Sequence, residues 1–328
     1  MDEAQRNKIQ YLEEMNRLMS VQAAPAQMSL GTRYQYGIST KEDCDTSTLY
    51  FEAAARTTVD FIDRTFGLIG PEKKQLNLMG PFAIADSFSF NRVLTLENFY
   101  TSTDVVELLD LQGAYGSTDS LNFLGWSTMQ GKGKMERDFQ KAYQLFQKAL
   151  EIDENDPTAN YCIGLLHMLG LVEGEPSNAR KAVQHLEKAG DDSRALNALG
   201  VIYYIAPEVF ETDPVRLAGF YGVKRDMKKA MRLLSQAAEA GNVQAFFNLG
   251  AIHLDQNNPD TFSFSKAYDK FKEAASNGHT LAGYNLGVMH YTGLGTFKSC
   301  NVANAFLKHV VTMGENSVDM ARAYKLVE

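Results

Sequence analysis

Histidines and cysteines are the residues of this chain whose chemistry could support metal binding or catalysis, and it has six and three of them. His167, His253 and His290 each lie three residues after a glycine, where two other copies of the same sequence pattern have tyrosine. A metal site would need the three imidazoles to converge, but they belong to separate copies. We therefore predict that these histidines pack at an aromatic core position and bind no metal.

The remaining candidates for chemistry are equally isolated. His185, His279 and His309 have no cysteine or carboxylate at metal-ligand spacing, and the sequence has no His-Glu-x-x-His motif. Two pairs of carboxylates, Glu13–Glu14 and Asp191–Asp192, are adjacent in sequence. Adjacent residues on a helix do not face each other, so neither pair forms a catalytic dyad. We predict no catalytic residue and no cofactor, and therefore no enzyme.

Cys162 and two glycine-rich segments are the last candidates for chemistry. Cys162 lies beside Ile163 in an apolar stretch, which predicts a small buried side chain rather than a nucleophile. The segments 131–134 and 293–296 carry Gly-x-Gly, but neither matches a phosphate-binding loop, which needs Gly-Lys-Ser/Thr after a strand. We interpret both segments as turns between helices.

These residues are positioned by a repeat. The pattern Ala-x-x-x-Leu-Gly, with Ile or Ser as occasional replacements, occurs six times, and its glycines are Gly31, Gly125, Gly164, Gly200, Gly250 and Gly287. A period near 36 residues with variable insertions indicates a helical repeat array. A glycine inside a helix costs about 1 kcal/mol relative to alanine. Its recurrence at one register indicates that it allows a neighbouring helix to approach closely.

A second helix follows each of four glycines and begins with Lys-Ala. Four residues after that alanine comes a large apolar residue, which is Phe146, Leu186, Leu234 or Phe271. A spacing of four places alanine and the large residue on one helix face. Gly241 and Gly278 stand where a helix ends in the left-handed conformation. The pattern predicts an all-α fold: a right-handed α-solenoid of helix-turn-helix repeats with irregular insertions.

The composition restricts the classes of partner that this chain can bind. The net charge of −8 and the pI near 5.4 argue against a nucleic-acid backbone as the main partner. The longest apolar stretch, 163–172, is only half of what a membrane span needs. We therefore expect other proteins as partners, with no direct membrane span in this chain, and the sequence leaves the oligomeric state open.

We expect three segments along the chain. Residues 1–65 hold an N-terminal helix and the first repeat, 66–115 an irregular aromatic-rich insertion, and 116–328 five further repeats and a C-terminal helix. A second insertion, about 205–225, falls in the longest interval between repeat glycines. It supplies the candidate partner-binding loop, with side chains Phe210, Leu217, Phe220 and Tyr221, because insertions in repeat arrays often form the binding face. The alternative is that these aromatic residues fold back on the core.

The repeat resembles the Sel-one-like repeat, a relative of the tetratricopeptide repeat. Two segments, 26–47 and 282–310, resemble more narrowly the family of endoplasmic-reticulum adaptors of the HRD ubiquitin ligase. Each has a cysteine thirteen residues after its repeat glycine, Cys44 and Cys300. The resemblance implies a non-catalytic interaction scaffold in ER-associated degradation. The competing expectation is a structural accessory subunit of another large assembly in a different compartment.

The chain also departs from that family. We expect no signal peptide, no transmembrane anchor and no glycosylation sequon from this sequence, and its last residues correspond to a point where the family continues into another helix pair. We expect either a fragment of a luminal protein, located in the endoplasmic reticulum lumen, or a diverged short relative that resides elsewhere.

The cysteines give one geometric prediction. Cys44 and Cys300 occupy the same turn in the first and last repeats, so an extended array separates them by several tens of ångströms at about 10 Å per packed helix. A disulfide needs Cα atoms closer than about 7 Å. We predict that these two cysteines are not joined, and that each of the three is free or bridges to another molecule or segment. Only a superhelix that closes on itself could join Cys44 to Cys300.

Overall fold

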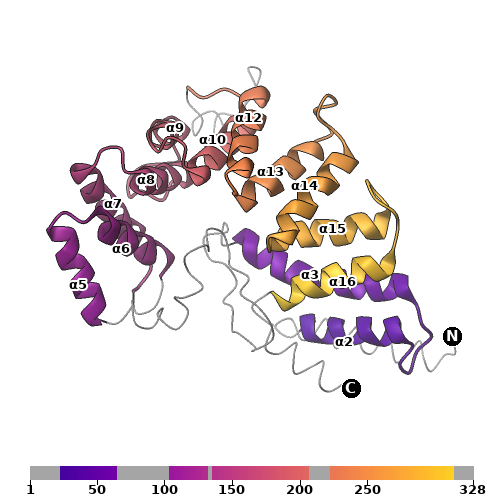
Figure 1. The fold of residues 1–328 in the computed structure, drawn as a ribbon. Helices are drawn as coiled ribbons and strands as arrows, with labels where there is room; N and C mark the ends of the chain where they lie inside the picture. Colours follow the sequence, from indigo (N-terminus) through magenta and orange to yellow (C-terminus); the bar gives the residue numbers. More distant parts are fainter. Residues whose placement is uncertain (1–22, 65–102, 132–134, 207–221, 314–328) are drawn as a thin grey trace. The chain divides into compact units, whose positions relative to one another are not determined.

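The structure is a computed structural model that describes residues 23–64, 103–131, 135–206 and 222–313. These ranges contain helices and no strand, which confirms the all-α repeat fold (Figure 1). The helices are α2 (Ala23–Tyr36), α3 (Cys44–Arg64), α5 (Thr103–Ala114), α6 (Thr118–Gln130), α7 (Phe139–Ile152), α8 (Pro157–Leu169), α9 (Ala179–Lys188), α10 (Ser193–Ile205), α12 (Met227–Glu239), α13 (Val243–His253), α14 (Phe264–Ser276), α15 (Thr280–Thr292) and α16 (Cys300–Thr312).

Most helices form antiparallel pairs, and the repeat glycine is the contact point within each pair. The glycine lies on the first helix and faces the large apolar residue of the second. A Cβ added to Gly250 would lie 2.6 Å from the Phe271 ring, and one added to Gly164 would lie 2.8 Å from Leu186 Cγ. The six pairs of facing residues are Gly31–Phe51, Gly125–Phe146, Gly164–Leu186, Gly200–Leu234, Gly250–Phe271 and Gly287–Leu307. The predicted packing role of the glycine register is confirmed.

Short polar residues start the helices. The side chains of Asp138, Asn178 and Asp226 each accept the backbone N–H three residues further on, at the starts of α7, α9 and α12. This N-cap bond satisfies one of the four N–H groups that a helix leaves without a partner. Gly131 and Gly293 end α6 and α15 in the left-handed conformation, with φ of 67° and 78°. Both glycines therefore belong to turns between helices, as predicted.

The chain divides into two compact units. Unit 1 comprises residues 1–84 and 250–328, and unit 2 comprises residues 85–249, so the boundary falls inside α13. In unit 2, second helices contact the first helix of the next repeat, as α7 contacts α8 and α9 contacts α10. Its core includes Ala182, Leu186 and Ile202, all fully buried.

Unit 1 brings the two ends of the described chain together. Helix α3 packs against α16, and Figure 1 shows the indigo α3 beside the yellow α16. Phe51 and Ala55 of α3 share one buried cluster with Leu307 and Val311 of α16. The first repeat therefore packs on the last one.

This packing overturns the cysteine prediction. Cys44 and Cys300 form a disulfide, with Cα atoms 5.9 Å apart across a sequence separation of 256. The prediction was wrong because it assumed that contacts follow sequence order along an extended array. Helix α3 contacts α16 directly, without the intervening repeats between them. Only Cys162 remains as a free thiol, and it is buried.

The expected segments need one further change. Residues 103–114 were expected to be part of an irregular insertion, but they form α5. Helix α5 packs on α6, as other second helices pack on the first helix of the next repeat. The N-terminal helix expected before the first repeat, and residues 66–102, lie outside the described residues.

Candidate interaction surfaces and the polar contacts that shape them

The histidines of the repeat position connect the first helix to the turn that follows it. His253 and His290 are buried, and Nδ1 of each lies within hydrogen-bond distance of a turn carbonyl, 2.7 Å from that of Thr261 and 3.2 Å from that of Phe297. Donation from Nδ1 leaves Nε2 of His290 free to accept from the Tyr268 hydroxyl at 3.2 Å. The predicted packing role is confirmed, and the rings also hold the turn.

The third histidine of this set has a different neighbour. The ring of His167 stacks on that of His185 from the second helix, with centroids 5.9 Å apart. Burial lowers the pKa of both imidazoles, and each is neutral near pH 7 as a result. Sequence reasoning treated the two as unrelated, because 18 residues and a turn separate them. In the described residues no group of three or more His, Cys, Asp or Glu could hold a metal ion.

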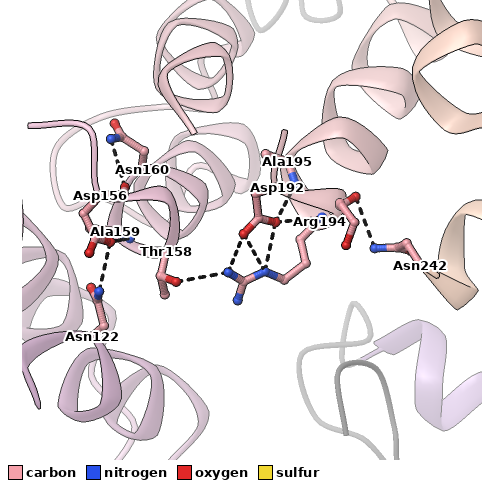
Figure 2. Close-up of polar contacts among 10 residues, drawn as sticks. Asn122, Asp156, Thr158, Ala159, Asn160, Asp192, Arg194, Ala195 and Asn242 are labelled. Atoms are coloured by element: carbon pink, nitrogen blue, oxygen red, sulfur yellow. Dashed lines mark hydrogen bonds and ion pairs between the residues drawn. The ribbon is translucent and has the colours of Figure 1, made fainter. Parts of the chain in front are cut away.

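A line of polar contacts links the starts of successive first helices in unit 2 (Figure 2). Asn122 of α6 donates from Nδ2 to Asp156 Oδ1 at 2.9 Å, and Asp156 also caps α8 by accepting from the Ala159 N–H at 2.7 Å. Further along, Asn242 Nδ2 donates to the Ser193 carbonyl at 3.2 Å. These contacts set how each repeat sits on the one before it.

Arg194 makes several of the contacts in this line. Its guanidinium donates to Asp192 Oδ2 at 2.6 Å and to Thr158 Oγ1 of α8 at 3.1 Å (Figure 2), and it lies 4.9 Å from the centre of the Tyr161 ring. Burial alone raises the pKa of Asp192, but the hydrogen bonds and charge of Arg194 outweigh burial and hold that pKa below its usual value. Asp192 is therefore a structural anion and an N-cap, not half of a catalytic dyad.

Cys162 has no catalytic role in this geometry. The side chain is fully buried, and burial strongly raises the pKa of its thiol. A nucleophilic cysteine requires a lowered pKa and access to substrate. The predicted role as a buried apolar residue is confirmed.

Exposed apolar side chains mark two candidate interaction surfaces. Leu108 and Leu111 of α5 and Tyr115, which directly follows the helix, recur at spacings of three and four and are 51%, 53% and 84% exposed. In unit 1, Leu294 and Phe297 stand exposed in the turn before α16. Clustered apolar surface of this kind marks interaction sites more often than scattered exposed residues do. The candidate loop residues Phe210, Leu217, Phe220 and Tyr221 lie outside the described residues, so their role stays a prediction.

The sequence profile of the Sel1 repeat matches five segments: residues 24–56, 118–152, 157–192, 216–242 and 281–308. The chain is a Sel1-repeat protein. Sel1 repeats mediate protein–protein interaction, and proteins built from them are generally non-catalytic scaffolds. Sel1-repeat membership supports the scaffold class predicted from the repeat and leaves the specific partners open.

Several solved structures are similar to this chain. A Sel1 repeat protein from Oxalobacter formigenes is 20% identical, with a TM-score of 0.47 over 71% of this chain and 82% of its own. A protective antigen of uropathogenic Escherichia coli that displays an SLR fold is 19% identical, with a TM-score of 0.44 over 88% of this chain and 61% of its own. An immunity protein from Pseudomonas aeruginosa is 18% identical, with a TM-score of 0.41 over 80% and 83%. No curated protein matches the sequence.

None of the helices in the described ranges combines the length and the apolarity that a membrane crossing needs.

Proposed function

We propose that this Sel1-repeat chain is the scaffold of an ER-associated degradation complex, acting as an adaptor subunit of a ubiquitin ligase in the endoplasmic reticulum lumen. The observation that carries the proposal is the Cys44–Cys300 disulfide. Disulfides form and persist in oxidising compartments and are rare in the cytosol. Both cysteines lie in the two segments whose sequence resembles the family of HRD-ligase adaptors.

The surfaces available to partners support an adaptor role. Apolar residues are exposed on α5 in unit 2 and in the turn before α16 in unit 1, so each unit offers a separate patch. An adaptor has to bind at least two proteins, and two patches on separate units can do so. The segment 205–225 remains the predicted third contact.

The alternative is a structural accessory subunit of another large assembly in a different compartment. It shares the scaffold fold, and differs in the expected state of the cysteines. In a reducing compartment Cys44 and Cys300 would be thiols.

Isolation of the tagged protein from its source cells would test the proposal. Membranes are solubilised after thiols are blocked, and ubiquitin-ligase subunits bound to the tagged chain are measured by quantitative mass spectrometry. We expect a membrane-bound ubiquitin ligase in stoichiometric amounts. Recovery of a stable assembly without a ligase would overturn the adaptor role and favour the accessory subunit.

Matched variants locate the contact. Phe220→Ser tests the predicted loop, Tyr115→Ser tests the α5 patch, and Ile152→Ser, at an exposed apolar residue outside both patches, serves as the control. We expect the first two to reduce ligase recovery at least fivefold and the control to leave it unchanged. Equal recovery with all three would remove these patches from the account.

A further inference from the structure

Helices α3 and α16 contact each other at equal positions of two repeats. Cys44 pairs with Cys300, and Thr48 Oγ1 lies 2.7 Å from Asn304 Oδ1, and both pairs are 256 residues apart in sequence. Equal offsets mean that the two helices run parallel and begin at the same level. The contact is therefore between two second helices. The disulfide lies at the N-terminal end of both helices.

This contact differs from the others in the described chain. Other second helices pack against the first helix of the next repeat, as α14 packs against α15. Helix α16 is covered instead by α3, which buries Leu307, Val310 and Val311. Terminal repeats of an array need a cover for their apolar face. The pair α2–α3 supplies that cover.

The contact is held by polar as well as apolar groups. Asn304 is fully buried and donates to Ser47 Oγ at 2.7 Å. At the periphery Tyr284 donates to Glu52 Oε1 at 3.1 Å, and Lys308 donates to the side chain of Gln35. Polar groups of this kind can be satisfied by water when the helices separate, so opening costs less than exposing an entirely apolar interface. The Cys44–Cys300 disulfide is the covalent component of this contact.

The position of the cysteines favours exchange. Both are partly exposed, and each is the first residue of its helix. A helix N-terminus stabilises a thiolate, and a stabilised thiolate is a better leaving group in thiol–disulfide exchange.

We propose that the Cys44–Cys300 disulfide is a redox latch on the cover that α2–α3 forms over α16. A dithiol reductant attacks one sulfur and forms a mixed disulfide, and the other cysteine leaves as a thiolate that takes up a proton. The second thiol of the reductant then displaces the first cysteine. The products are two cysteine thiols and the cyclic disulfide of the reductant. With the bond cut, α2–α3 separates from α16 and uncovers Leu307, Val310 and Val311. This proposal goes beyond the adaptor function, and it applies whichever assembly the chain joins.

Hydrogen exchange of the full chain, with and without dithiothreitol under native conditions, tests the latch. We expect reduction to speed exchange at least tenfold in α2, α3 and α16 and to leave α6 to α10 unchanged. Reoxidation should restore the original rates. Unchanged protection after reduction, or a bond that resists dithiothreitol without denaturant, would overturn the proposal.

Two variants separate opening from misfolding. The double variant Cys44→Ser, Cys300→Ser should show the exchange pattern of the reduced protein without reductant. If this variant loses protection throughout unit 1, it has misfolded, and the reduction and reoxidation of the unaltered chain become the test. Failure of the unaltered chain to regain protection on reoxidation refutes a latch. Cys162→Ala removes the free thiol alone and should respond to dithiothreitol like the unaltered chain.

Discussion

Two glycines of α15 allow the packing role of the repeat to be measured within one helix. A Cβ added to Gly287 would lie 2.8 Å from Leu307 Cγ, whereas one added to Gly283 would lie 3.4 Å from Val310 Cγ2. Ordinary contacts of a Cβ begin at about 3.4 Å, so the first substitution is short of space by 3.4 − 2.8 = 0.6 Å and the second is not. Leu307 is 1% exposed and has little room to move.

The free energies follow from this difference. Both substitutions to alanine gain about 1 kcal/mol of helix propensity, because both positions are inside α15. Gly287→Ala also incurs an overpacking cost of about 1–3 kcal/mol. We expect Gly283→Ala to be neutral or stabilising by up to about 1 kcal/mol. Gly287→Ala should be less stable than Gly283→Ala by about 1–3 kcal/mol, the overpacking cost alone.

The measurement has to report on unit 1. The single tryptophan, Trp126, lies in unit 2, so fluorescence is not suitable. Hydrogen exchange of peptides from α15 and α16, in the oxidised chain, gives the local opening free energy. In a Leu307→Ala background, Gly287→Ala should lose its cost, because the opposing Cγ is gone. Equal stability of the two single alanine variants would refute the view that the repeat glycine is a packing position.

Three other changes have expected outcomes. Burial lowers the pKa of His279 to about 4. Its neutral form therefore contributes stability that is full above pH 6.5 and is lost as the pH falls from 6.5 towards 4. His279→Asn keeps the helix cap and should flatten this part of a stability–pH curve measured by urea unfolding. Arg194→Ala should destabilise unit 2 by about 2–3 kcal/mol in unfolding followed by Trp126 fluorescence, because it removes charge-assisted hydrogen bonds to Asp192 and leaves that partly buried anion without them; Lys188→Gln, at a surface ion pair, should change it by less than about 0.5 kcal/mol. Leu108→Ser should leave the melting temperature within about 2 °C, since surface changes rarely exceed about 0.5 kcal/mol, and a larger fall would mean that the α5 patch is part of the core.

Local pattern predicted the helix pairs well. The glycine register and the large residue four positions after Lys-Ala are properties of single helices and of their nearest neighbours. Each such pair was therefore visible in the sequence, and Gly125–Phe146 and Gly200–Leu234 meet as the spacing requires. The histidines at the same register were recognised as core residues for the same reason.

Contacts between distant repeats were not predictable in this way. The pairing of α3 with α16 depends on where the chain returns in space, and no periodicity within a repeat encodes that return. The match between Cys44 and Cys300, each thirteen residues after a repeat glycine, was the available signal. It was interpreted as two equivalent positions far apart, when equal register is also what a parallel contact between the two helices produces.

The polar line through Asp156 and Arg194 was missed for a related reason. An aspartate before a helix indicates an N-cap, which is a local role. Asp156 also accepts a hydrogen bond from Asn122 of the preceding repeat, and Asp192 binds Arg194, which reaches Thr158 of the preceding repeat. Helix α5 was missed because an aromatic-rich stretch directly precedes it in the sequence. Its sequence Leu-Leu-x-x-x-x-x-x-Gly at 108–116 matches that of α12 at 233–241, and this likeness could have identified it as a second helix.

Peptide mapping of the protein from its source cells tests the central claim most directly. Thiols are alkylated before lysis, the ligase-bound fraction is isolated, and the chain is digested without reduction. The account predicts a linked peptide containing Cys44 and Cys300 from a single chain, with Cys162 alkylated only after denaturation. Alkylated Cys44 and Cys300 throughout the native population would contradict the disulfide between the first and last repeats and the oxidising compartment proposed for the protein.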